Sequence, residues 1–263
     1  MARFCPLFSS SSGNCTYIGT GRGGILIDAG VSAKRIEQAL CDPEIDPRTI
    51  EALFITHEHS DHIGGVRVFA ARYGIPVYAS AGTLRGMERA GACDRVDVRE
   101  MTEGADIAVA DMSVTAFPTP HDTVGSTGYI VTAADGRTLA VATDMGTVTD
   151  RVRQVLCGCD AVLIESNYDR HMLDVGPYPY PLKQRIAADT GHLCNDDCAA
   201  VLPTLVQSGV SHLFLGHLSP HNNLPALAEQ TAQNALDAAG LRPEVDYRLR
   251  VAERVSTAPV VYI

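Results

Sequence analysis

The sequence predicts an α/β fold in which mixed β-sheets are covered by helices. Short apolar runs of the kind found in buried strands recur along the 263 residues, and helical patterns lie between some of them. The first half holds more consecutive strand runs than a strict βαβ alternation would, and Asp135-Gly136 between two runs is a hairpin signal. These observations argue against a single parallel, doubly wound sheet.

Each expected strand is an apolar, β-prone run that ends near Gly, Pro, Asp, Asn or His. In chain order these runs are 24–27, 52–56, 76–78, 114–117, 128–131, 139–142, 161–164 and 212–215. The helices are expected at 32–40, 64–73, 195–208 and 224–239. The third helix has Asn195 as a candidate N-cap, and acidic residues follow in its first turn, where the helix dipole favours them.

Composition and charge exclude several classes of protein. The chain is too apolar for a disordered protein, with 46 % hydrophobic residues, and no apolar run reaches the roughly 18 residues of a membrane helix. Its formal charge of −10 argues against nucleic-acid binding through bulk charge, although a local basic patch is compatible with it. The first residues lack the apolar core of a signal peptide. We therefore expect a cytoplasmic protein whose eight cysteines are buried thiols.

The densest group of chemically active residues directly follows the strand run 52–56. It comprises His57, His59, Asp61 and His62. Histidines two apart at a strand end can point to one locus, and the Asp-His pair then reaches a second locus beside it. Imidazole and carboxylate are the ligands that borderline divalent metals prefer. The alternative is an accidental surface cluster, which the preceding apolar strand disfavours, because burying an uncompensated cluster is costly.

Three later strand runs each lead to another side chain of the ligand type. These side chains are His121, Asp144 and His217. For one such residue, a polar turn is the ordinary explanation. Three of them, together with the histidine cluster, predict that several strand ends contribute ligands to one metal site.

At this point the sequence resembles the metallo-β-lactamase fold superfamily. Residues 57–62 match its HxHxDH signature, and Asp28 matches the Asp that follows an early strand in that family. The later ligand motifs match, in order, His121, Asp144 and His217. The resemblance covers nearly the whole chain. It implies one domain over residues 1–263, built as a four-layer αββα sandwich with two mixed β-sheets.

The resemblance also implies a dinuclear metal site. One ion takes His57, His59 and His121, the other takes Asp61, His62 and His217, and Asp144 bridges them. Asp28 either orients a ligand or is a turn residue that caps the following helix. Zn²⁺ is expected, and Mn²⁺ or Fe would also fit this donor set. Two such ions lower the pKa of a shared water, so that a bridging hydroxide attacks the substrate, and Asp61 is expected to hydrogen-bond this water as well as to ligate.

Further segments resemble the YycJ/WalJ branch of the superfamily, which is associated with 5′-to-3′ DNA exonuclease activity. These segments are 9–15, 165–168, 178–185, 191–197 and 216–223. That branch carries a His where this chain has Tyr168 and a Ser where it has Cys194, which puts an acid–base role at position 168 in doubt. His171, three residues on, is either a substitute or a solvated surface residue, and the role of His221 stays open.

These segments suit a phosphodiester substrate. The candidate substrate-binding residues are Ser11, Ser12, Asn14, Asn167, Lys183 and Arg185. The Ser-rich turn either binds an anionic oxygen through its amides or is an ordinary turn between strands. The two cations, with Tyr178 and Tyr180 as stacking residues, either contact nucleic acid or are surface and packing residues. His192, just before a helix, is expected to donate a proton to a phosphate oxygen or to the leaving group.

The expected function is therefore a metal-dependent phosphodiester hydrolase, most simply a nuclease acting on DNA. Two alternatives stay open: a phosphodiesterase for nucleotides or sugar phosphates, and a non-catalytic metal-binding protein. Only 72 residues separate Asp144 from His217, too few for the large strand-clamping insertion of RNA-processing relatives. A clamp would have to come from loops or from the second subunit of a homodimer.

Overall fold

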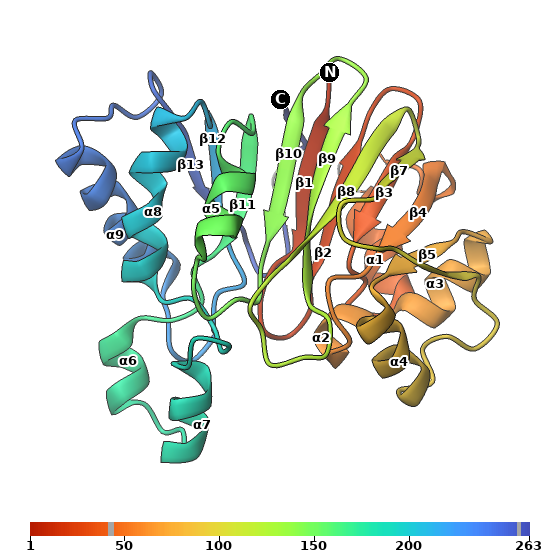
Figure 1. Ribbon diagram of the computed structural model, residues 1–263, viewed down its shortest axis with the longest axis horizontal. Helices are drawn as coiled ribbons and strands as arrows, with labels where there is room; N and C mark the ends of the chain where they lie inside the picture. The colour runs from red at the N-terminus through yellow and green to blue at the C-terminus, as the bar shows by residue number, and fades with distance from the viewer. Residues whose placement is uncertain (42–44, 257–258) are drawn as a thin grey trace. The chain divides into compact units, whose positions relative to one another are not determined.

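The computed structural model describes residues 1–41, 45–256 and 259–263 and contains two seven-stranded sheets with flanking helices (Figure 1). The chain divides into two compact units. Unit 1 is Met1–Pro118, Thr123–Thr138 and Glu253–Ile263, and unit 2 is Thr119–Asp122 and Leu139–Ala252. The predicted class, mixed sheets with helices, is confirmed, whereas the single-domain organisation stays a prediction.

Unit 1 contains a complete mixed sheet in the strand order β14-β1-β2-β3-β4-β5-β6. Its strands are β1 (Arg3–Phe8), β2 (Cys15–Gly19), β3 (Gly24–Ile27), β4 (Ile50–Phe54), β5 (Val77–Ala79), β6 (Val98–Glu100) and β14 (Val261–Tyr262). The pairs from β14 to β3 are antiparallel, and those from β3 to β6 are parallel. β4 ends two residues before the predicted run does, so Thr56 belongs to the loop that follows the strand.

The two faces of this sheet pack against different partners within unit 1. Helices α1 (Ala33–Cys41), α3 (Val66–Tyr73) and α4 (Ala81–Arg89) contribute to the buried cluster on one face, where Leu53 of β4 packs with Ile36 and Phe69. Because side chains alternate along a strand, Phe54 points to the opposite face from Leu53. The centroid of its ring lies 5.6 Å from that of the Tyr129 ring. Tyr129 also donates to the Ile55 carbonyl at 2.6 Å.

Tyr129 belongs to an antiparallel meander that unit 1 contributes to the second sheet. Its strands are β7 (Asp106–Val109), β8 (Met112–Pro118) and β9 (Thr127–Ala133). The predicted turn follows β9: Ala133 N donates to the Arg137 carbonyl at 2.8 Å, and Gly136 supplies the left-handed backbone with φ +83°.

The helix predicted at 64–73 is wrong at its start. The chain forms the short helix α2 (Ser60–Ile63), breaks at Gly64-Gly65, and continues as α3. A Cβ on Gly65 would lie 2.1 Å from the carbonyl oxygen of Val31, so the break allows a close backbone approach that no other residue permits. The 3₁₀ turn η1 (Pro47–Thr49) precedes β4.

Unit 2 contributes four parallel neighbours in the order β10-β11-β12-β13. They are β10 (Thr138–Ala142), β11 (Ala161–Glu165), β12 (His212–Gly216) and β13 (Arg248–Val251). Parallel strands place all their carboxyl ends on one edge. Helix α8 (Asn195–Gln207) packs with α5 (Asp150–Leu156) and with α9 (Pro225–Ala238), and α9 also packs with β13. Helices α6 (Arg170–Val175) and α7 (Tyr180–Ile186) lie in the segment that connects β11 to α8 (Figure 1).

Two details of unit 2 correct the sequence predictions. The N-cap of α8 is Cys194 rather than Asn195, because the Cys194 Sγ accepts a hydrogen bond from Asp197 N at 3.4 Å. The expectation that all cysteines are buried thiols is also wrong in part. All eight are free thiols, but Cys41 is exposed and Cys93 and Cys157 are half-buried.

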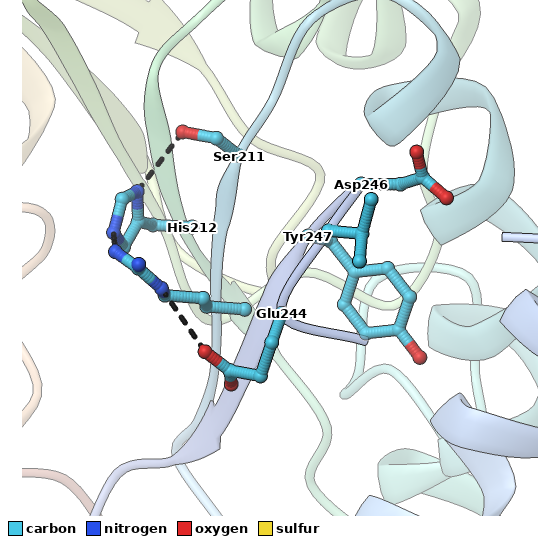
Figure 2. A pocket seen from close by; sticks show the side chains of 7 residues that line it. Ser211, His212, Glu244, Asp246 and Tyr247 are labelled. Atoms are coloured by element: carbon cyan, nitrogen blue, oxygen red, sulfur yellow. Dashed lines mark hydrogen bonds and ion pairs between the residues drawn. The ribbon is translucent and has the colours of Figure 1, made fainter. Parts of the chain in front are cut away.

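A small cavity of about 210 Å³ lies at the amino ends of β12 and β13 (Figure 2). His212 accepts from Arg248 Nη1 at 3.3 Å on one ring nitrogen and donates to Ser211 Oγ at 2.9 Å on the other, and Arg248 pairs with Glu244. These bonds connect the first residues of β12 and β13. They lie at the end of the sheet opposite to the carboxyl ends of the parallel strands. Among the described residues, no helix has the length and apolar character needed to cross a membrane.

Candidate functional site

The loop after β4 carries the first cluster of ligand-type side chains, all in unit 1. His59 is the N-cap of α2, which fixes the direction of the two residues that follow Ser60. The ring centroids of His57 and His59 are 4.5 Å apart, and those of His57 and His62 are 4.1 Å apart. Asp61 Oδ2 lies 3.6 Å from His62 Nε2. The structure therefore brings these four predicted residues together.

Asp28, which follows β3, anchors this cluster. Its carboxylate accepts from Thr56 N at 2.8 Å and from His62 Nδ1 at 2.8 Å, and Thr56 Oγ1 lies 3.1 Å from His57 Nδ1. A proton held on Nδ1 of His62 leaves Nε2 in the unprotonated form that binds metal, as a carboxylate partner typically ensures for a metal-ligating histidine. Asp28 therefore orients a candidate ligand, the first of the two roles expected for it.

The Ser-rich turn supports the cluster from the other side. Asn14 N donates to the Asp61 carbonyl at 2.8 Å, and Asn14 Nδ2 lies 3.0 Å from His62 Nε2, so binding of a metal by that nitrogen requires the amide to give up this contact. Ser12 N donates to Ser10 Oγ, and Gly13 N donates to the Ser10 carbonyl. These amides bond within the protein, which favours an ordinary turn over an anion cradle, while the Ser11 and Ser12 side chains are exposed.

Gly30 is the point where three loops meet, and its lack of a side chain is essential. A Cβ there would lie 1.6 Å from the Asp61 carbonyl oxygen and 2.7 Å from Asn14 N. We expect Gly30→Ala to displace the turn that carries Asp61 and His62, lowering the free energy of unfolding by about 1–3 kcal/mol or more and weakening Zn²⁺ binding measured by calorimetry. Gly21→Ala is the matched control, since a Cβ at Gly21 meets nothing within 4 Å. Wild-type Zn²⁺ affinity in Gly30→Ala would contradict this account of the turn.

The carboxyl edge of the parallel strands carries the second cluster, all in unit 2. Asp144 follows β10, Glu165 ends β11, His217 follows β12, and His192 lies just before α8. Each offers a ligand atom within 4.8 Å of the others. His121 joins them: its Nε2 lies 3.9 Å from Asp144 Oδ1, and its Nδ1 lies 3.0 Å from the Gly191 carbonyl oxygen, which fixes the tautomer as for His62.

Glu165 organises this cluster, although it was not predicted from the sequence as a site residue. It is fully buried, and its Oε1 accepts from His192 Nδ1 at 2.8 Å and from His217 Nδ1 at 2.9 Å. Its Oε2 accepts from Met145 N at 2.8 Å and from Leu193 N at 3.3 Å. One signal in the sequence could have indicated this role. Glu165 is the last residue of a strand, and the two neighbouring strands also lead to ligand-type residues.

The charges of the second cluster depend on one another. Burial raises the pKa of Glu165, but the charge of His192 and the two imidazole hydrogen bonds outweigh burial and hold that pKa well below its usual range. Burial lowers the pKa of His192, but the Glu165 and Asp144 carboxylates more than offset this and raise it above its ordinary value. His192 thus keeps a proton on Nδ1 toward Glu165, and its raised pKa makes a second proton on Nε2 easier to hold than on a free histidine.

Three residues of the two clusters share an unusual backbone. Asp28, Asp144 and His217 have left-handed φ angles of +63°, +57° and +55°. Asp and His tolerate this region better than most residues, yet it still costs of order 1–3 kcal/mol each and persists where surrounding contacts enforce it. Such conformations are common at functional sites. There they give a side chain a direction that it would not have at the end of a regular strand.

The candidate substrate-binding cations are both engaged within unit 2. Lys183 Nζ donates to the Asp174 carbonyl at 2.7 Å, and Arg185 forms an ion pair with Asp122, the neighbour of His121. Asn167 is buried, only 3 % exposed, and donates to the His217 carbonyl.

The other candidates on this stretch of unit 2 differ in exposure. Tyr180 is 71 % exposed, at the start of α7, and Tyr178 is half-buried with its ring 6.0 Å from that of His221. His171 is exposed, in agreement with a solvated surface residue, and Tyr168 is buried and bridged to Cys194.

Comparison with known proteins gives a consistent picture. Residues 24–218 match the family model of a beta-lactamase superfamily domain. The chain is 36 % identical over 238 residues to exodeoxyribonuclease YycJ of Bacillus anthracis, covering 90 % of each chain. It is 35 % identical over 264 residues to exodeoxyribonuclease WalJ of Streptococcus pneumoniae serotype 2, covering 99 % of this chain and 98 % of that one. The crystal structure of the metallo-beta-lactamase fold protein YhfI from Bacillus subtilis is similar with a TM-score of 0.73 and 13 % identity, covering 97 % and 98 % of the two chains.

Proposed function

The chain belongs to the metallo-β-lactamase superfamily, and because its histidine and carboxylate clusters are those of a metal-binding hydrolase of that fold, we propose that it is a metal-dependent nuclease that digests DNA from the 5′ end. The observation that carries the proposal is its likeness to exodeoxyribonucleases, at 35 % and 36 % identity over nearly the whole chain. Likeness over such a length includes the segments outside the metal-ligand motifs.

We assign the predicted ligands to two divalent ions. His57, His59 and His121 would hold one ion, Asp61, His62 and His217 would hold the other, and Asp144 would contribute its carboxylate to both. The donor chemistry of each cluster supports this assignment, because the Nδ1 atoms of His62, His121 and His217 lie within hydrogen-bonding distance of carboxylate or carbonyl oxygens. Imidazole and carboxylate donors suit Zn²⁺, and Mn²⁺ or Fe are the alternatives.

The proposed mechanism divides the work between these ions and the side chains of the chain. Two divalent ions, when bound, activate water at neutral pH and neutralise charge on the phosphate. Asp61 accepts a hydrogen bond from the attacking water and orients it. His192 donates the proton on its Nε2 to the leaving oxygen, while Glu165 holds the opposite side of the ring through Nδ1.

One observation favours a second candidate, a phosphodiesterase for nucleotides or other small phosphodiesters. The chain carries a charge of −10, and Lys183 and Arg185 both bond to acceptors within the protein. These two cations are therefore already engaged, and the exposed Tyr180 at the start of α7 is a candidate for stacking on a longer DNA strand.

The experiment that tests the proposal compares DNA with a small substrate. Digestion of 5′- and 3′-labelled single- and double-stranded DNA is followed in Zn²⁺ and Mn²⁺, beside hydrolysis of bis(p-nitrophenyl) phosphate. We expect release of mononucleotides from the 5′ end and a kcat/KM for DNA far above that for the small ester. A preference for the small ester by orders of magnitude would replace the nuclease with the phosphodiesterase, and no hydrolysis of either would leave a metal-binding protein.

A further inference from the structure

A buried cluster of one hydroxyl and three amide side chains lies next to the second cluster of ligand-type residues, in unit 2. It comprises Ser166, Asn167, Asn195 and Asn223, with exposures of 1 %, 3 %, 3 % and 4 %. Ser166 Oγ donates to Asn195 Oδ1 at 2.7 Å, and Asn195 Nδ2 donates to Asn223 Oδ1 at 2.9 Å. Burying so many polar groups is tolerated only when they are hydrogen-bonded, and a bonded network of this kind fixes the backbone around it.

Asn167 connects this network to both of the histidines that Glu165 contacts. Its Nδ2 donates to the His217 carbonyl at 2.7 Å, and its backbone N donates to the Leu193 carbonyl, next to His192, at 2.8 Å. Its own carbonyl accepts from Ser219 N at 2.8 Å and from Asn223 Nδ2 at 3.1 Å. One residue therefore joins the end of β11, the start of α8 and the loop after β12.

The hydrogen bond from Asn167 Nδ2 reaches the His217 carbonyl at a point where the backbone conformation is unfavourable by itself. His217 is 1 % exposed and has a left-handed φ of +55°, a conformation that costs of order 1–2 kcal/mol for a residue with a side chain. Its carbonyl is buried with it, so losing a hydrogen-bond donor there would carry a further penalty. The Asn167 amide meets this need and fixes the peptide plane that directs the His217 ring toward Glu165.

We propose that Asn167 is a positioning residue, which holds His217 in its left-handed conformation so that the imidazole Nε2 faces the metal. The inference rests on the proposed function only in taking His217 as a metal ligand. It replaces the substrate contact expected for Asn167 from the sequence, because a side chain that is 3 % exposed and donates to a buried carbonyl is turned toward the protein.

Two matched substitutions in the full-length chain test this role. Asn167→Leu keeps the branched shape and removes the donor. Asn222→Leu is the matched control, because it makes the same change at another asparagine of the loop after β12. Asn222 is 1 % exposed, and its amide nitrogen lies 3.5 Å from Ser219 Oγ rather than near a candidate metal ligand. Binding of Co²⁺ to the metal-free proteins is titrated by visible absorption, and thermal unfolding is measured in chelator. Asn167→Ala is the second variant should the larger side chain prevent folding.

We expect the Asn167 variants to bind the ion held by His217 about 10- to 100-fold more weakly, with an altered Co²⁺ spectrum. Asn222→Leu should lose stability but keep the wild-type spectrum and affinity. Wild-type affinity and spectrum in a folded Asn167 variant, or equal losses in the Asn167 and Asn222 variants, would overturn the positioning role and leave the proposed function standing. A wild-type chain that binds no Co²⁺ would overturn the proposed function and this inference with it.

Discussion

Replacing Asp144 with Asn should lower kcat/KM on DNA by about 10³-fold or more while leaving the fold intact. Asp144 is the proposed bridging ligand, and two-metal chemistry supplies several kcal/mol of transition-state stabilisation, each 1.36 kcal/mol being tenfold in rate. Asn keeps the side-chain shape and tolerates the left-handed backbone at φ +57°, whereas Ala would add strain of its own. His59→Ala, which removes a ligand of the first cluster, should have a similar effect. Activity is measured on 5′-labelled DNA with saturating metal.

Asp150→Asn is the matched control for this prediction. Asp150 is also in unit 2, in the first turn of α5, where its side chain is 83 % exposed and pairs with Arg153. Its replacement should change kcat/KM by less than a factor of about 2, since surface substitutions of this kind shift energies by about 0.5 kcal/mol at most. Wild-type turnover in Asp144→Asn, with circular dichroism unchanged, would remove Asp144 from the reaction.

Replacing Glu165 with Gln should lower the free energy of unfolding of the metal-free chain by about 3 kcal/mol or more, because it breaks a buried charge pair. The amide nitrogen of Gln would face either the N–H groups of both imidazoles or the backbone N–H groups of Met145 and Leu193, and in both orientations donors would oppose donors. For a chain of this size the loss corresponds to a fall in Tm of roughly 6–12 °C. It is measured by thermal unfolding in chelator, followed by the residual nuclease rate with metal added.

Glu100→Gln provides the comparison for Glu165, because Glu100 is exposed at the end of β6. It should shift the free energy of unfolding by no more than about 0.5 kcal/mol. Equal stability of the Glu165 and Glu100 variants would mean that Glu165 does not hold the second cluster together.

The sequence was sufficient for the parts of the fold whose signals are local. The runs 161–164 and 212–215 are almost wholly apolar, so they were predicted as buried strands, and they form β11 and β12. Strands β7 and β13 alternate exposed and half-buried residues and carry charges, and they were not predicted because their burial depends on neighbours. The metallo-β-lactamase fold and the YycJ/WalJ likeness are confirmed by the comparisons. Both were predictable because the HxHxDH motif and the segments that resemble YycJ/WalJ are contiguous in the sequence.

The supporting residues of the site could not be predicted in the same way. Glu165 gains its role from His192 and His217, which lie 27 and 52 positions further along the chain. Asn167 was expected to contact substrate because its segment resembles the YycJ/WalJ branch, and nothing in the sequence indicated that its amide donates to a carbonyl 50 positions away. Such roles depend on which distant backbone groups the parallel sheet brings to one edge.

Hydrolysis by the proposed mechanism requires that the predicted ligands of unit 1 and those of unit 2 bind metal ions. The most direct measurement is the metal content per chain, by mass spectrometry, recorded with the rate of 5′ digestion as chelator removes the metal and Zn²⁺ or Mn²⁺ restores it. We expect two ions per chain, a rate that rises and falls with occupancy, and loss of bound metal in both His57→Ala and His217→Ala. A chain that digests DNA at the full rate with no metal bound, or variants that keep both ions, would contradict the proposed metal-dependent mechanism.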